Sequence, residues 1–186
     1  MKKKKIQVRP IDGQLHAACQ KLNVEGIIEA VQAGADINAP DENGYAPLDI
    51  VSRVADNWQT GDYRHDPVLQ KKVRKIVDIL IGYGANPDGA TGEYLPLEVF
   101  ALRGCDPHVC SKLARAGATL NAVSDEDTIL DSVNNEINGI INVDTDEDPA
   151  VLDRLNKIYD TLVWRGAKHF DELNEQTEQE TDNELQ

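Results

Sequence analysis

The sequence predicts an all-α protein in which four helix-turn-helix units stack side by side as a helical-repeat solenoid. A Gly-Ala dipeptide recurs four times, at intervals of 50, 33 and 49 residues, and a period of 33 residues is typical of stacked helix pairs. Each dipeptide also ends an apolar amphipathic run, where a helix needs a glycine in the left-handed conformation in order to stop. The dipeptides begin at Gly34, Gly84, Gly117 and Gly166.

The units alternate between short and long. We expect one repeat domain over residues 1–170, because this length suits a single domain and four units exceed the usual minimum of about three. The two long units each contain about sixteen extra residues, part of which lies near 54–65 and 136–147. The four units cover approximately residues 10–40, 41–88, 89–122 and 123–170.

The remaining extra length belongs to the second helix of each long unit. Asp66 and Asp148 are expected N-caps, since each is followed by a proline at the first helical position. Asn23 and Asp106 are the corresponding residues of the short units, and they stand closer to the glycine that ends the helix. The second helices of the long units should therefore be about two turns longer.

A second periodicity relates alternate units. Unit four repeats unit two at a constant offset without a gap, so that Leu48 and Asp49 match Leu130 and Asp131. Unit three repeats unit one in the same way in its second half, where Asn121 matches Asn38. We interpret this pattern as a duplicated two-unit block, and convergence of alternate units is the alternative interpretation.

Further residues within the units match a known family. Unit one reads Leu15-His-Ala-Ala-Cys19 and then Gly34-Ala-Asp-Ile-Asn-Ala39, and unit two begins Asp41-Glu-Asn-Gly-Tyr-Ala-Pro-Leu48. The chain thus resembles the ankyrin repeat family, with the pattern D-x-x-G-x-T-P-L-H-x-A-A followed later by G-A-D-x-N-A, over about residues 10–170. The histidine of this pattern occurs once and is replaced in the other units; the four residues at its place are His16, Asp49, Glu98 and Asp131.

The composition limits the possible partners. The net charge is −14, and residues 171–186 contain seven acidic residues and no basic one, which predicts a disordered acidic tail. An acidic chain of this kind should repel nucleic acids and anionic membranes. Three cysteines do not form a disulfide framework, and the Lys2–Lys5 run lacks the apolar stretch of a signal peptide, so we expect a cytoplasmic protein.

No motif predicts catalysis, a metal site or a cofactor. The segment from Cys105 to Cys110 includes His108 and is the best zinc candidate, but it offers only three ligands and no second cluster supplies a fourth. We expect Cys19 and Cys110 to be small buried side chains. The protein is accordingly expected to be a non-catalytic binding module without a cofactor, although catalytic groups brought together from distant units remain a third class of function.

The turns between units are the first candidate for a partner-binding surface. In ankyrin-like proteins these turns project as fingers, and here the fingers contain acidic residues but no Lys or Arg. Two tyrosines stand at corresponding places beside them, and aromatic residues often supply binding energy while charges steer the encounter. The alternative is that each tyrosine packs on its own turn and the acids merely face water. The candidate finger residues are Asp41, Glu42, Tyr45, Glu93, Tyr94, Asp125, Glu126 and Asp127.

The two insertions, near 54–65 and 136–147, are the second candidate surface, because insertions in repeat arrays often map to the binding face. The first of them contributes Trp58 and Tyr63 as candidate partner-binding residues. A tryptophan in a polar loop is either an exposed anchor or a local plug, and the plug is favoured because an exposed tryptophan costs solubility.

Two classes of function follow from the acidic surface. The first is a protein-protein interaction module that is a monomer on its own and binds a basic protein partner. Small acidic ankyrin-like proteins of this kind resemble bacterial immunity proteins, which implies a toxin as the partner. The second is a cytoplasmic regulatory or scaffold subunit of a client enzyme.

Overall fold

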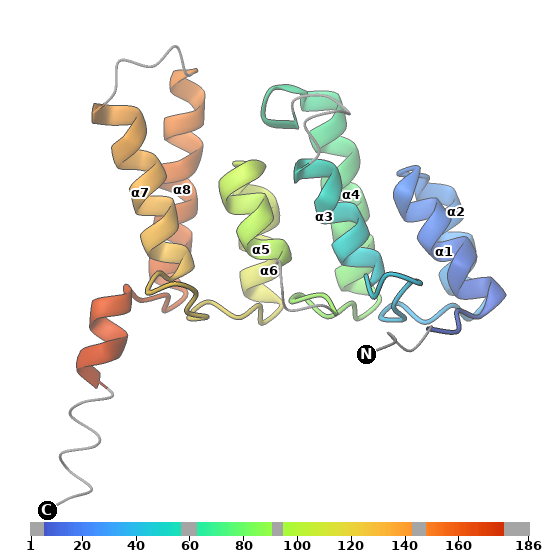
Figure 1. Ribbon diagram of the computed structural model, residues 1–186. Helices are drawn as coiled ribbons and strands as arrows, with labels where there is room; N and C mark the ends of the chain where they lie inside the picture. The colour runs from blue at the N-terminus through green and yellow to red at the C-terminus, as the bar shows by residue number, and fades with distance from the viewer. Residues whose placement is uncertain (1–5, 57–62, 91–94, 143–147, 177–186) are drawn as a thin grey trace, which may run out of the picture.

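The computed structural model describes residues 6–56, 63–90, 95–142 and 148–176, and over these residues the chain is helical, without a strand (Figure 1). Tyr63–His65 is a short 3₁₀ helix, η1, and Val99–Arg103 is a π-helical segment, η2, that directly continues α5. The α-helices are α1 (Pro10–Gln20), α2 (Val24–Gln32), α3 (Pro47–Asp56), α4 (Pro67–Gly82), α5 (Pro96–Glu98), α6 (Pro107–Arg115), α7 (Ile129–Asn142) and α8 (Pro149–Trp164).

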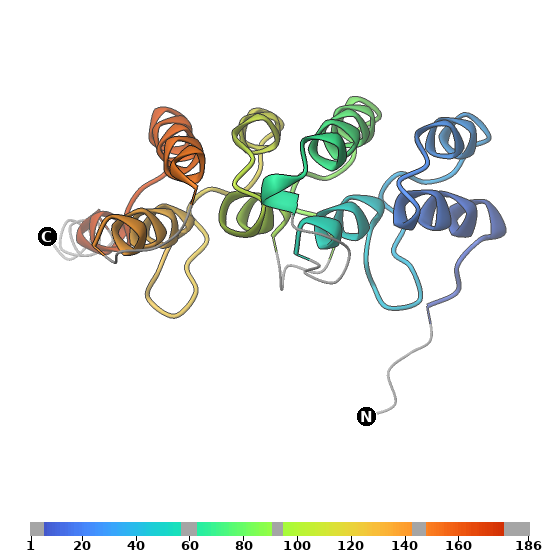
Figure 2. The same ribbon diagram turned by 90° about the horizontal axis from the view of Figure 1, so that it is seen from above.

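In the described part of the chain the helices form four pairs that lie in a row, one pair for each unit (Figure 1). Viewed from above, the first helices of the units form one layer and the second helices form the other (Figure 2). Within the first layer α1 packs on α3, α3 on α5 and η2, and η2 on α7, while in the second layer α2 packs on α4, α4 on α6, and α6 on α8. The core is therefore a continuous apolar spine between the layers.

The helix ends follow the capping residues that the sequence predicts. Asn23, Asp66, Asp106 and Asp148 each accept a hydrogen bond from a backbone amide of the first helical turn. Each of the four Gly-Ala glycines has a positive φ, between 88° and 94°. These glycines end the second helices because a residue with a Cβ is strained in that conformation.

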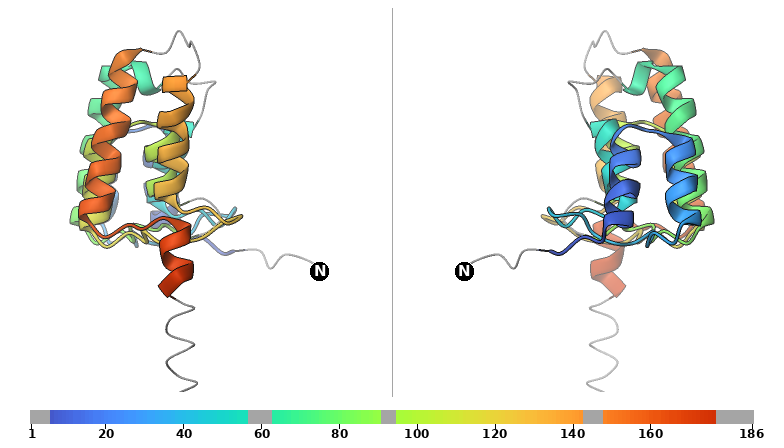
Figure 3. Two further views of the ribbon diagram at one scale, coloured as in Figure 1. Left: turned by 90° about the vertical axis from the view of Figure 1, so that its left-hand side faces the viewer. Right: turned by 90° about the vertical axis from the view of Figure 1, so that its right-hand side faces the viewer.

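The long units have longer second helices, as predicted. α4 and α8 each contain 16 residues, whereas α2 and α6 each contain 9. The difference of seven residues corresponds to roughly 10 Å of helix. The ends of α4 and α8 consequently rise above the short unit between them (Figures 1 and 3).

Side chains of the two long units form hydrogen bonds with unit three and with each other. Arg64 donates hydrogen bonds to the carbonyl oxygens of Leu102 and Arg103 in η2, and its guanidinium lies 3.1 Å from Oε1 of Glu136 on α7. From α8, Arg154 Nη1 donates to the Arg64 carbonyl oxygen over 2.7 Å. We call this set of contacts the inter-unit bridge, because it joins units two and four over the short unit.

The loops at the base of the row are joined from unit to unit. Asn38 donates to the Gly84 carbonyl oxygen over 3.1 Å and accepts from the Asn86 amide over 2.7 Å. Asn121 makes the same pair of bonds with Gly166 and Lys168, at 3.4 Å and 2.9 Å. The corresponding residues of units one and three thus have the same role, as the predicted relation between alternate units requires.

The segment after α8 differs in part from its predicted disorder. Residues 170–176 form a further helical segment, which extends below the base of the row (Figures 1 and 3). The first residues of the predicted acidic tail are therefore helical, while residues 177–186 lie outside the described part of the chain. None of the helices in the described ranges is both long and apolar enough to cross a membrane.

Candidate partner-binding surface

The turn at residues 40–45 projects on the side of the first-helix layer, and its shape depends on Asp41 (Figure 2). The Asp41 carboxylate accepts hydrogen bonds from the backbone amides of Asn43 and Tyr45, at 2.8 Å and 3.0 Å. This side chain is only 8 % exposed. Asp41 therefore builds the turn and is not available to a partner, which corrects its predicted role, whereas Glu42 at the tip is exposed.

Tyr45 is half-buried and is covered by a cation from the following helix. The Arg53 guanidinium lies over its ring, 4.5 Å from the ring centroid. Such a stack attracts the cation to the face of the ring. The exposed group at this place is therefore Arg53, which is not among the residues predicted from the sequence.

The turn between Ser124 and Asp127 is a tight hairpin that exposes three acidic side chains. The two residues exchange backbone hydrogen bonds of 2.9 Å and 3.0 Å, and Asp125 and Glu126 have φ values of 52° and 64°. Positive φ at both central residues is the geometry of a type I′ turn. The side chains of Asp125, Glu126 and Asp127 are all exposed.

Tyr63 does not belong to the surface, and its predicted role in partner binding is corrected. Its side chain is 2 % exposed, it packs on Phe100, and its hydroxyl donates to the Asp106 carboxylate over 2.7 Å. Burial raises the pKa of this hydroxyl further above its ordinary range. Arg74 completes the buried group with a 2.9 Å ion pair to Asp106. Three further candidates, Trp58, Glu93 and Tyr94, lie outside the described residues.

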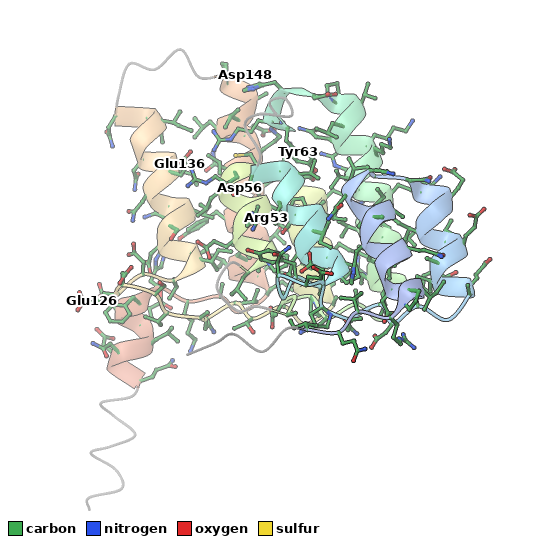
Figure 4. All side chains as sticks on the ribbon, turned by 45° about the vertical axis from the view of Figure 1, so that its right-hand side comes forward. Arg53, Asp56, Tyr63, Glu126, Glu136 and Asp148 are labelled. Atoms are coloured by element: carbon green, nitrogen blue, oxygen red, sulfur yellow. The ribbon has the colours of Figure 1, made fainter. Side chains whose placement is uncertain are left out.

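The first-helix layer carries charges of both signs. Arg103 lies 3.7 Å from Asp56 on α3, and both side chains are more than half exposed. Figure 4 shows Arg53 and Asp56 on α3, Glu136 on α7, and Glu126 at the tip of the second hairpin. The acidic character predicted for the surface therefore describes the hairpins, while the helices behind them are mixed.

Two pockets open where a short unit meets the turn that follows it. One pocket is lined by Arg9, Gly13, His16 and Glu42, among others, and the second by Leu95, Glu98, Ser124 and Asp125, among others. Two of the lining residues correspond through the repeat of alternate units, because Gly13 and His16 recur as Leu95 and Glu98, and each pocket also contains an acidic residue of the turn that follows, Glu42 or Asp125. The two short units thus present pockets at equivalent places.

The four residues that stand where the ankyrin-like pattern has its histidine differ in their hydrogen bonds to the backbone that follows the second helix of each unit. In three units the side chain forms a hydrogen bond with the backbone of the segment that follows the unit's second helix, whereas the Glu98 side chain is exposed and makes no hydrogen bond within the described residues. Glu98 lines the second pocket instead. The three bonds are His16 to the Ala39 carbonyl oxygen, Asp49 to the Ala90 amide and Asp131 to the Phe170 amide.

The cysteine side chains are placed for packing. Cys19, Cys105 and Cys110 are buried, and burial raises the pKa of the Cys19 thiol to about 12. The His108 side chain is 53 % exposed and faces Asp78 at 3.5 Å, so it does not converge with the buried thiols. Among the residues with defined positions, no group of three or more His, Cys, Asp or Glu side chains could hold a metal ion.

No protein-family model matches the sequence, and no curated protein matches it.

Proposed function

We propose that the protein is an ankyrin-type repeat solenoid that acts as a non-catalytic binding module for a basic protein partner in the cytoplasm. The observation that carries the proposal is the exposure of Glu42, Asp125, Glu126 and Asp127 on hairpins that contain no Lys or Arg. These hairpins project on one side of the row, beside the first-helix layer (Figure 2).

Electrostatic complementarity supports a basic partner. Carboxylates at the tips of projecting turns attract a cationic surface and raise the association rate more than the affinity. Arg53 and Arg103 behind the hairpins would then select partners that also present acidic or aromatic groups. A toxin with a cationic active site is one such partner, and we propose that the protein neutralises a toxin of this kind as an immunity protein.

The test is affinity capture of the native partner with a charge-reversed variant. Glu42, Glu126 and Asp127 are changed together to Lys, and the matched control changes Glu25, Glu29 and Asp160 to Lys. The control alters the net charge by the same amount on exposed positions of the second-helix layer. Asp125 is retained because its left-handed backbone favours Asp over Lys.

Loss of capture by the hairpin variant, with capture by the control retained, supports the proposal. Equal capture by both variants contradicts it and moves the binding surface elsewhere. For the isolated pair, the association rate should fall steeply as the salt concentration rises, because exposed charges are screened within about 10 Å at 0.1 M salt. The identity of the captured protein distinguishes a toxin from a client enzyme.

A further inference from the structure

The pocket beside the second hairpin combines carboxylates with an apolar wall. Its volume is about 190 Å³, and it is formed by the start of the first helix of unit three, the loop after α6, and the start of α7. Half-buried apolar side chains and exposed carboxylates share the lining. The residues that matter for binding are Leu95, Leu120, Ile129, Glu98, Asp125 and Asp127.

Within the described part of the chain, Glu98 has no structural partner that would explain its presence. Its counterparts His16, Asp49 and Asp131 are bonded to the backbone that follows the second helix of their unit, and they are more buried than Glu98. Glu98 makes no such bond within the described residues and lines the pocket of unit three. His16 lines the equivalent pocket of unit one although it is bonded to Ala39, so what distinguishes unit three is that the carboxylate of Glu98 is available to a ligand.

The equivalent pocket beside the first hairpin is electrostatically different. It is lined by Arg9 as well as Glu42, and its Asp41 carboxylate is occupied by the backbone of the turn. Of the described residues that line the pocket of unit three, three are acidic and none is Lys, Arg or His. The two pockets are alike in position, and only the second is complementary to a cation.

We propose that the Glu98 pocket receives one arginine or lysine side chain of the partner. Long cationic side chains place their methylene groups along apolar surface and their charged head beside carboxylates, which is the arrangement this lining offers. Glu98 and Asp127 hold the charged head, and Leu95, Leu120 and Ile129 contact the stem. This inference rests on the proposed function and identifies the part of the partner that is recognised.

The experiment uses the full chain and a defined probe. The ¹⁵N-labelled protein is titrated with the peptide acetyl-Gly-Arg-Gly-amide, and separately with the same peptide containing citrulline, which has nearly the same shape but no charge. The arginine peptide should shift the backbone amides of Thr119, Ser124 and Thr128 in a saturable manner. The citrulline peptide should bind about threefold to fivefold more weakly, as expected for a partly exposed ion pair.

Variants then locate the interaction. Glu98→Gln should weaken binding of the arginine peptide about threefold to fivefold, and Glu42→Gln, which changes an exposed carboxylate of the first pocket, should leave it unchanged. Both side chains are exposed, so neither change disturbs the core. Equal binding of the two peptides, or shifts spread over acidic residues of both hairpins, would overturn the inference. Capture that depends on the hairpin charges would then still support the proposed function, so the two failures are distinguishable.

Discussion

Asp49 and Asp131 occupy the same place in units two and four, and yet their carboxylates have opposite pKa shifts. Asp49 Oδ2 accepts from the Ala46 and Ala90 amides, while its buried Oδ1 has no hydrogen-bond partner in the described structure. Burial raises the pKa of this carboxyl. Oδ2 of Asp49 thus connects unit two to unit three, while Oδ1 is buried without a hydrogen bond in the described structure.

Asp131 joins the last unit to the segment after it with more donors. Oδ2 accepts from the Thr128 amide, the Thr128 hydroxyl and the Phe170 amide, and Oδ1 faces His169 Nδ1. Although burial opposes ionisation, these hydrogen bonds lower the pKa of Asp131 to about 2. The comparison teaches that a repeated residue preserves the connection between units, whereas its ionisation depends on neighbours that the repeat does not preserve.

The largest expected effect comes from Gly89, which has a φ of 70° and would place a Cβ against Asp49 Oδ1. Gly89→Ala should lower the free energy of unfolding by about 3 kcal/mol or more, because left-handed strain of about 1–2 kcal/mol adds to the overlap. Urea denaturation measures the loss. Gly34→Ala is the control, since Gly34 also has a positive φ but open space around it. Equal losses would show that close packing on Asp49 is unimportant.

The second-largest expected effect distinguishes Asp131 from Asp49 by replacing each with asparagine. Asp131→Asn should lower the free energy of unfolding by about 2–3 kcal/mol at neutral pH, because hydrogen bonds to a charged group are lost. Asp49→Asn should cost less than about 1 kcal/mol, because one acceptor oxygen remains and a buried charge is removed. Denaturation of both variants under the same conditions provides the measurement, and equal costs would break the comparison.

The pH dependence should differ in sign. The pKa of Asp131 is about 2 in the folded chain against an ordinary 3.8, so its contribution of about 2 kcal/mol is complete above pH 4 and is lost as the pH falls toward 2. The contribution of Asp49, whose pKa is raised, should instead decrease as the pH rises above 3.8. Unfolding curves of the wild type and the two asparagine variants from pH 2 to pH 6 test this, and parallel profiles for the two variants would refute it.

The smallest expected effect concerns Asn38 and Asn121, which make the same pair of hydrogen bonds in units one and three. Asn38→Ala and Asn121→Ala each remove two exposed hydrogen bonds to the next loop. Each change should cost about 1 kcal/mol, with the smaller loss at Asn121 because its bond to Gly166 is longer. Thermal or urea unfolding of the two variants measures these losses. If the two losses differ by more than about 1 kcal/mol, Asn38 and Asn121 do not have equivalent roles in units one and three.

The sequence was sufficient for the features that depend on local chemistry. The caps at Asp66 and Asp148, the glycines that end the helices, and the extra two turns of α4 and α8 all follow from residues within one helix. Asp41 was misassigned to the partner surface although a local signal was present. An Asp two residues before Asn43-Gly44 favours a turn closed by its own side chain.

The remaining features depend on residues that are distant in the sequence. Tyr63 is buried against Phe100 and its hydroxyl donates to Asp106, 43 positions later, and no local pattern around Tyr63 indicates these partners. The pocket at Glu98 likewise appears only when neighbouring units are packed together. The stack of Arg53 on Tyr45 lies within unit two and depends on how the turn at residues 40–45 meets α3. These are the features that distinguish the candidate surface from a uniformly acidic one.

The inter-unit bridge changes how the array is expected to come apart. In a simple linear array each module touches only its immediate neighbours, so the terminal module can fray alone. Here the Arg154 side chain is bonded to the backbone at Arg64, two modules away, so opening of the final helix pair also removes a contact from the second. Unfolding from the C-terminal end should consequently propagate past unit three, and the chain would behave as one cooperative block.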